Sequence, residues 1–189
     1  MKKLFLLLAS LCVSGVLYAQ SAYPSKPITL VVPYPVGGSN DIFARLIAKN
    51  LGDVLKVSVV VDNRPGASGS TGTAQVSKAP PDGYTLLAVS SSMTTNAAIQ
   101  TKASFDPATG LTPIAMLAKG PFIVAVNNDL HVKNPAELIA LFKANPGKFN
   151  YASSGTGSSN QFATELLKVM SGTFVLHIPY RAWVQQLLI

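Results

Sequence analysis

Short runs rich in β-branched residues alternate with helix-like runs along this chain, and this alternation constrains its fold more than any other feature. Such alternation is typical of α/β proteins, in which helices connect parallel strands. We expect strands at 28–32, 57–61, 84–90, 112–117, 122–127, 148–152 and 173–178, and helices at 41–52, 70–78, 94–100, 135–145 and 158–170. The sequence therefore predicts an α/β fold with a mainly parallel sheet.

One of the expected helices has a clear signal at its start. Asn134 offers a side chain that caps a helix, and Pro135 suits the first helical position, where no backbone donor is needed. Glu137 adds a negative charge to the first turn, which the helix dipole favours. We therefore expect a helix that begins after Asn134 and ends near Asn145.

Two Gly-rich segments, PYPVGGSND at 33–41 and SSGTGSSNQ at 153–161, each run directly into an expected helix. A helix N-terminus carries unpaired backbone N–H groups and about half a positive charge, and glycine lets the backbone approach an anion. Two such segments on one cleft would bind a small carboxylate. The alternative is that Gly37 and Gly38 only make a tight connection between a strand and a helix.

The N-terminal residues 1–19 have the order of a secretory signal peptide. Lys2 and Lys3 precede an apolar run at 4–18, and Ala19 is a small residue suited to cleavage. We expect cleavage near Ala19, with a permanent membrane anchor as the alternative. Cleavage would remove Cys12, the one cysteine, so the mature chain would have no disulfide and no thiolate for catalysis or zinc.

Charge and motif content exclude several classes of function. The 15 lysines and arginines outnumber the 8 acidic residues, but they are scattered singly, so nucleic acid is not an expected partner. His131 and His177 stand alone, so we expect no metal site, and no cofactor motif is present. Residues 66–69 read G-A-S-G, which is not the G-x-S-x-G pattern of hydrolases. We expect no enzyme.

Several motifs stand in one order along the chain: YPSKPITLVVPYPVGGSNDIFARLIA, VVVDNRPGASGSTGTAQVSKAPPDGYTLL, NPAELIALFKANPGKFNYASSGTGSSNQFATELLK and HIPYR. Together, over residues 23–181, they resemble the Bug family of periplasmic solute-binding proteins, the TctC-type receptors of tripartite tricarboxylate transporters. The resemblance implies a periplasmic-binding-protein fold of type 2 with two lobes. It places the first lobe at 20–120 and the second at 121–189, with the fold incomplete at the C-terminus.

The resemblance also implies a function and a site. The function is an extracytoplasmic receptor that captures a small carboxylate, such as a tricarboxylate or dicarboxylate, in the periplasm for membrane transporter subunits or a sensor protein. The implied ligand contacts are Tyr34, Val36, Gly37, Gly38, Ser39 and Asp41 in the first loop, Ser90, Ser91 and Asn96 after the third strand, and Ser154, Gly155, Thr156, Gly157, Ser158 and Gln161 in the second loop.

Three of these assignments have open alternatives. Asp41 would repel a bare carboxylate, so it could instead stabilise its helix or hold a water or an ammonium group. Serines such as Ser90 and Ser91 are often solvated or capping residues in loops. Gln161 stands where the family often has histidine, which puts a specific ligand contact there in doubt.

After Arg181 the residues AWVQQLLI depart from the family pattern. Our hypothesis is that a one-base deletion shifted the reading frame and truncated the product, and the alternative is a genuine short variant. A truncated chain would leave strand edges and apolar faces uncovered, and we expect it to bind ligand weakly or not at all. The alternative function is therefore a remnant with no ligand-binding activity.

Overall fold

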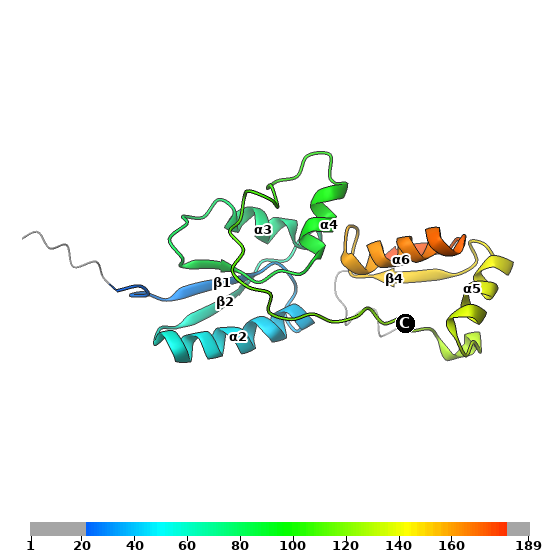
Figure 1. Ribbon diagram of the computed structural model, residues 1–189, viewed down its shortest axis with the longest axis horizontal. Helices are drawn as coiled ribbons and strands as arrows, with labels where there is room; N and C mark the ends of the chain where they lie inside the picture. Colours follow the sequence, from blue (N-terminus) through cyan, green and yellow to red (C-terminus); the bar gives the residue numbers. More distant parts are fainter. Residues whose placement is uncertain (1–21, 181–189) are drawn as a thin grey trace, which may run out of the picture.

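The computed structural model describes residues 22–180, and these residues form two parallel sheets (Figure 1). The first has the strand order β2-β1-β3, from β1 (Ile28–Val32), β2 (Val59–Asn63) and β3 (Thr85–Leu87). The second pairs β4 (Asn150–Ser153) with β5 (Leu176–Pro179). The expected α/β fold with parallel strands is confirmed. The signal peptide at 1–19, Cys12 and the tail from Arg181 onward lie outside the described residues.

Helices cover both faces of the first sheet. Helix α2 (Ser39–Leu55) lies on one face, and α3 (Ser70–Val76) and α4 (Ser92–Ile99) lie on the other, after the short 3-10 helix η1 (Ala67–Gly69) (Figure 1). Strand β1 is central and buried, because it pairs with a strand on each side. The core consists of Leu30 and Val32 of β1 together with Ala44, Ala48 and Ala88. We call β1–β3 with α2–α4 the N-terminal unit.

The C-terminal unit consists of β4, β5, α5 (Pro135–Ala144) and α6 (Ser159–Ser171), and the short 3-10 helix η2 (Asn128–Leu130) precedes it. The capping signal at Asn134 is confirmed, because its side chain accepts the backbone N–H of Glu137 at 3.0 Å. The Glu137 carboxylate in turn accepts the backbone N–H of Lys133 at 2.7 Å. Between residues 22 and 180, no helix has the length and apolarity needed to cross a membrane.

The bounds of four strands differ from the expected ones. Strands β4 and β5 begin at Asn150 and Leu176, two and three residues after the expected starts. Strand β2 begins at Val59 and not at Val57, because α2 continues to Leu55 and ends at Lys56 in the left-handed conformation. The pairing of Ile28 with Val59 then sets the register of the strand. Strand β3 spans only Thr85–Leu87 of the expected 84–90, and the residues after it form a loop that leads to α4.

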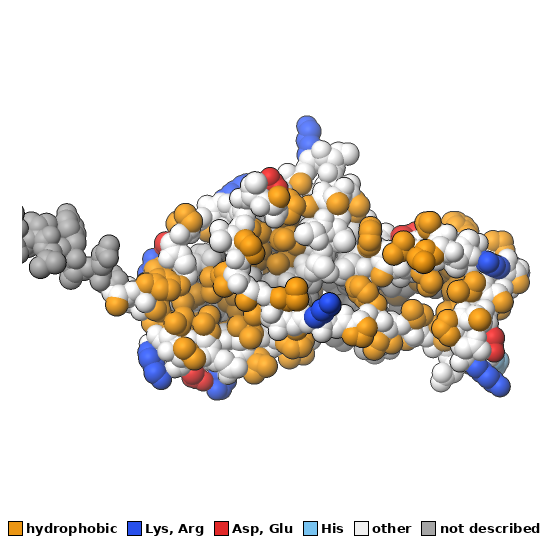
Figure 2. Space-filling model, viewed as in Figure 1, with side chains coloured by type: hydrophobic (Ala, Val, Ile, Leu, Met, Phe, Trp, Pro, Cys, Tyr) orange, Lys and Arg blue, Asp and Glu red, His pale blue; other side chains and the backbone are white. Residues whose placement is uncertain are grey.

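The strands expected at 112–117 and 122–127 are wrong, because these residues are extended but unpaired. β-branched residues favour a strand only where a neighbouring strand supplies the hydrogen bonds, and none of the described strands reaches them. Their apolar side chains are exposed, with Ile123 at 86% and Met116 at 80%. Figure 1 shows this segment crossing between the two units, and Figure 2 shows hydrophobic side chains on the same face. The lobe boundary at residues 120 and 121 falls within the segment and stays a prediction.

Because these side chains are exposed, replacing Ile123 with lysine should reduce aggregation and change the free energy of unfolding by less than about 0.5 kcal/mol. Light scattering during heating and a denaturant titration measure the two effects. The matched control is Ile28→Lys, at a fully buried position of β1, which should prevent folding. Equal losses of stability in the two variants would contradict the exposed placement of Ile123.

Candidate functional site

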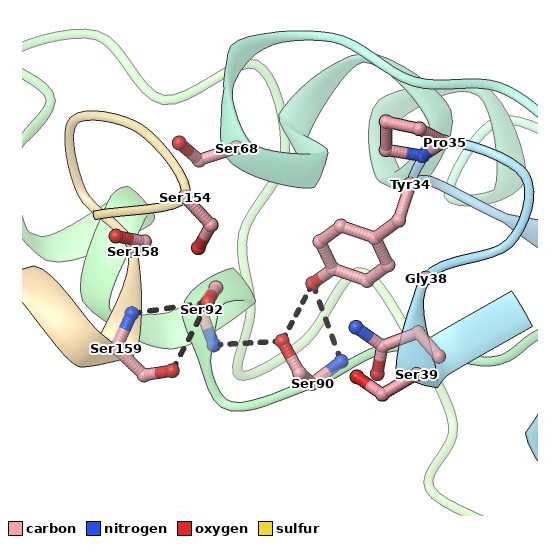
Figure 3. A pocket seen from close by; sticks show the side chains of 11 residues that line it. Tyr34, Pro35, Gly38, Ser39, Ser68, Ser90, Ser92, Ser154, Ser158 and Ser159 are labelled. Atoms are coloured by element: carbon pink, nitrogen blue, oxygen red, sulfur yellow. Dashed lines mark hydrogen bonds between the residues drawn. The ribbon is translucent and has the colours of Figure 1, made fainter. Parts of the chain in front are cut away.

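The two Gly-rich loops line one cavity of about 190 Å³ between the N-terminal and C-terminal units (Figure 3). The first loop and the serines after β3 contribute from one side, and the loop between β4 and α6 contributes from the other. The lining residues are Tyr34, Pro35, Gly38, Ser39, Asn40, Ser68, Ser90, Ser92, Ser154, Ser158 and Ser159.

None of the lining side chains carries a formal charge; most of them are hydroxyls. The positive potential at the cavity comes instead from two helix N-termini, since α2 begins at Ser39 and α6 at Ser159. Gly38 precedes α2 without a side chain to cap it. The wall can therefore solvate an anion with hydroxyl and backbone donors, while no lining group can act as a strong acid or base.

Tyr34 anchors the first loop to the segment after β3. Its hydroxyl lies 2.8 Å from Ser90 Oγ and accepts the backbone N–H of Ser90 at 3.3 Å (Figure 3). Burial raises the pKa of Tyr34, so the phenol stays neutral and remains able to donate a hydrogen bond at physiological pH.

Asp41 does not line the cavity. Its carboxylate instead stabilises the first loop through hydrogen bonds within the protein. Its carboxylate accepts the Gly37 backbone N–H at 2.9 Å, Asn63 Nδ2 at 2.9 Å and Arg45 Nε at 3.0 Å. The hydrogen bond from Arg45 is the main reason that the pKa of Asp41 falls to about 2. The structure thus favours the alternative in which Asp41 stabilises the loop, and its expected ligand contact stays a prediction.

Six of the residues expected from the family pattern line the cavity: Tyr34, Gly38, Ser39, Ser90, Ser154 and Ser158. The others lie beside it or turn away from it: Val36, Gly37, Asp41, Ser91, Asn96, Gly155, Thr156, Gly157 and Gln161. Val36 points into solvent with 68% of its surface exposed. Asn96 is buried between the units, where it donates to the Thr156 carbonyl at 3.3 Å. Binding roles for the six cavity residues stay a prediction.

Sequence reasoning missed four lining residues, Pro35, Asn40, Ser68 and Ser159, whereas Ser92 lies in the segment after the third strand that resembles the second contact segment of the family. Ser92 and Ser159 are the first residues of α4 and α6 and directly follow the N-cap residues Ser91 and Ser158, so the serine-rich start of α6 could have indicated Ser159. Ser92 and Ser159 meet across the two units, where Ser92 Oγ accepts the backbone N–H of Ser159 at 3.0 Å. Ser68 gave no such signal, because only the folded chain brings its hydroxyl to the Thr156 carbonyl, at 2.6 Å.

Further contacts join the units at the second loop. Thr95 Oγ1 donates to the Gly157 carbonyl at 2.8 Å. Gly157 has a φ of +80°, and a Cβ atom there would collide with Asn96 and come within 3.0 Å of Ile99. A glycine is therefore required where the second loop packs against α4. Across residues 22–180, no three His, Cys, Asp or Glu side chains are grouped closely enough to hold a metal ion.

Residues 43–188 match the family described as the tripartite tricarboxylate transporter family receptor, TctC. The chain belongs to this receptor family. It is 37% identical over 161 residues to protein BugT of Bordetella pertussis, an alignment that covers 84% of this chain and 49% of BugT. The expected family is therefore confirmed, and the family is one of receptors and not of enzymes.

Solved structures agree with the TctC-type fold. Rpa4515 of R. palustris, solved with adipate, has a TM-score of 0.81 at 35% identity, over 87% of this chain and 56% of that one. MatC of Rhodopseudomonas palustris, solved with bound malate, has a TM-score of 0.78 at 27% identity, again over 87% and 56%. BugD, with a TM-score of 0.73 at 30% identity, is described as a periplasmic binding protein.

These TctC relatives confirm the expected periplasmic-binding-protein fold over the part that aligns. The chain spans about half the length of the relatives it matches, for example 48% of a protein of Pseudomonas sp. strain P51 at 36% identity. The activity of a complete TctC receptor is therefore a proposal for this chain. The frameshift hypothesis also stays a prediction, because it concerns DNA that a protein comparison does not test.

Proposed function

We propose that the cavity is the binding site of an extracytoplasmic receptor for a small organic acid with two or more carboxylates. The observation that carries the proposal is the meeting of two glycine-rich loops and two helix N-termini at one uncharged, hydroxyl-rich cavity. Backbone N–H groups and serine hydroxyls in such a site replace the water around a carboxylate. No nucleophile in the cavity lining is paired with a general base, so the site offers no means of chemically converting a bound acid.

The ligand class follows from the wall and from the relatives. Gly38 and Ser158, which precede the two helices, line the cavity and can present backbone donors to a carboxylate, and Ser90 and Ser92 offer hydroxyls to a second polar end. Adipate and malate, the ligands in the structures of Rpa4515 and MatC, are both dicarboxylates. We therefore infer a dicarboxylate or tricarboxylate as the ligand of this chain.

Isothermal titration calorimetry of the mature chain with adipate and malate tests the proposal. A few charge-assisted hydrogen bonds, each worth about 1.5–3 kcal/mol, suffice for a Kd of about 10 µM. The control ligand is adipamide, which has the same carbon chain but no negative charge, and we expect it to bind at least tenfold more weakly. Equal affinity for adipate and adipamide would show that the cavity does not select anions.

The proposal includes export and a membrane partner. The relatives include periplasmic proteins, and the residues before Gln20 resemble a signal peptide, so we propose that the mature chain works in the periplasm and delivers its ligand to transporter subunits or to a sensor. N-terminal sequencing of the exported protein should start near Gln20. A membrane-bound product that retains residues 1–19 would instead support the anchor alternative.

One observation favours the second candidate, a chain without ligand-binding activity. The extended segment at 112–127 exposes apolar side chains that a soluble receptor would cover. Titration of this chain beside a version with the reading frame restored separates the candidates. Heat of binding from both supports the receptor, and heat from the restored version alone supports the remnant.

A further inference from the structure

His177 lies behind the second loop and outside the cavity lining, on β5. Its Nε2 is 2.5 Å from Ser153 Oγ, and its Nδ1 is 3.2 Å from Gln161 Nε2. These two partners stand at either side of the loop, because Ser153 ends β4 and Gln161 is in the first turn of α6. The imidazole therefore bridges the two ends of the segment that faces the cavity.

Both partners of His177 also hold backbone groups of the loop. Ser153 Oγ accepts the Gly155 N–H at 3.1 Å and donates to the Gly155 carbonyl at 3.2 Å. Gln161 Oε1 accepts the Gly157 N–H at 2.7 Å. The loop residues Gly155 and Gly157 are thus fixed by side chains that His177 itself orients.

The hydrogen bonds determine which imidazole nitrogen carries the proton. A backbone N–H can only donate, so Gln161 must turn its oxygen to Gly157 and its NH₂ group to His177. The NH₂ group also only donates, so Nδ1 is the acceptor and the proton is on Nε2, which donates to Ser153 Oγ. Ser153 then uses its own hydroxyl proton for the Gly155 carbonyl, and every group in the chain of hydrogen bonds is satisfied.

We propose that neutral His177 is the positioning residue of the second loop, and that protonation of His177 releases the loop. A proton on Nδ1 would face the NH₂ group of Gln161, which places two donors against each other. If the Gln161 amide turned over in response, its NH₂ group would meet the Gly157 N–H, and the loop would lose that acceptor. The effect on ligand binding rests on the proposed receptor function, whereas the effect on the loop does not.

The surroundings of His177 set the range in which this release occurs. Tyr151 on β4 stacks on the imidazole, with ring centroids 4.9 Å apart, and α6 brings Glu165 and Lys168 close. Burial lowers the pKa of His177 from its ordinary value of 6.5, Glu165 opposes this shift and Lys168 adds to it. The imidazole is therefore neutral at pH 7.5, and the unfolded chain takes up the proton first as the pH falls. Stability from this group is complete above about pH 6.5 and is lost as the pH decreases toward the lowered pKa.

NMR of the ligand-free chain tests the proposal directly. The NMR sample is the variant His131→Gln. The substitution removes the other histidine, so every imidazole signal comes from His177. In this variant we expect imidazole ¹⁵N shifts of the Nε2–H tautomer at pH 7.5. The amide resonances of Gly155 and Gly157 should move with the same midpoint as the imidazole during acidification. An Nδ1–H tautomer, or loop amides that do not follow His177, would overturn the proposal.

A second measurement compares adipate binding at pH 7.5 and pH 5, below the ordinary pKa of histidine, because the pKa of His177 is lowered. The chain with His177 should lose at least threefold more affinity over this range than His177→Gln, whose side chain does not titrate, and the comparison cancels the titration of adipate itself. Equal losses in the two proteins would overturn the proposed effect on binding. If adipate binds neither protein while the loop amides still follow His177, the proposed function fails and the positioning role of His177 stands.

Discussion

Replacing Asp41 with alanine will lower the free energy of unfolding by about 3 kcal/mol, as measured by denaturant titration. The carboxylate is only 3% exposed and accepts hydrogen bonds from Gly37, Asn63 and Arg45. The alanine variant leaves the Gly37 N–H without its acceptor and removes one of the two acceptors of Asn63 Nδ2, which keeps the Tyr34 carbonyl at 3.2 Å. Because Arg45 is half exposed, its charge is solvated in the variant and adds little to the loss.

Asp53→Ala is the matched control for Asp41→Ala, since both residues are on α2 and each pairs with a basic residue one turn away. Asp53 is 67% exposed, so its loss should change stability by less than about 0.5 kcal/mol. The pKa of Asp41 is lowered to about 2, so its contribution is complete above about pH 4 and disappears as the pH falls to about 2. Similar effects of the two substitutions would contradict the structural role of Asp41.

Replacing Gly157 with alanine will weaken adipate binding by about a hundredfold, which is about 2.7 kcal/mol. The residue has a φ of +80°, which costs a non-glycine residue about 1–2 kcal/mol, and its Cβ would push Asn96 out of the contact between the units. Asn96 would then lose its hydrogen bond to the Thr156 carbonyl, and the second loop would shift relative to the cavity. Calorimetry measures the affinity.

Gly172→Ala separates backbone strain from the collision. Gly172 also has a left-handed φ, of +63°, but nothing lies within 4 Å of the position where its Cβ would be. We expect this variant to lose about 1 kcal/mol of stability and to bind adipate with unchanged affinity. If both variants lost affinity equally, the contact between Gly157 and Asn96 would have no part in forming the site.

Local sequence signals correctly predicted the helix and the strand whose ends are set by residues nearby in the sequence. Asn134, Pro135 and Glu137 gave the start of α5, and the run at 28–32 gave β1 with both of its ends. The segment at 112–127 failed because its composition favours a strand while pairing depends on residues far along the chain. Strand β2 was misplaced by two residues for the same reason, since its register is set by β1.

The sequence predicted the parts of the site that the backbone of the two glycine-rich loops forms. The glycines of the two loops indicated their own positions, and both loops do line one cavity. Ser68 was missed because a serine in a polar stretch looks the same whether it faces solvent or another unit. Asp41 was assigned to the ligand because it lies in the loop that matches the family's motif, whereas its side chain turns to Arg45 and Asn63.

The uncharged wall of the cavity has a consequence for how such a receptor can change its preference among acids. In the proposed receptor, attraction for the anion comes from peptide dipoles, whose orientation is set by the course of the main chain and not by the identity of the lining side chains. A lining serine such as Ser39, which takes no part in the contacts that anchor the loops, could therefore be exchanged for another small residue during evolution while the general affinity for acids is kept. The preference among acids and the general affinity for acids can therefore change independently of each other.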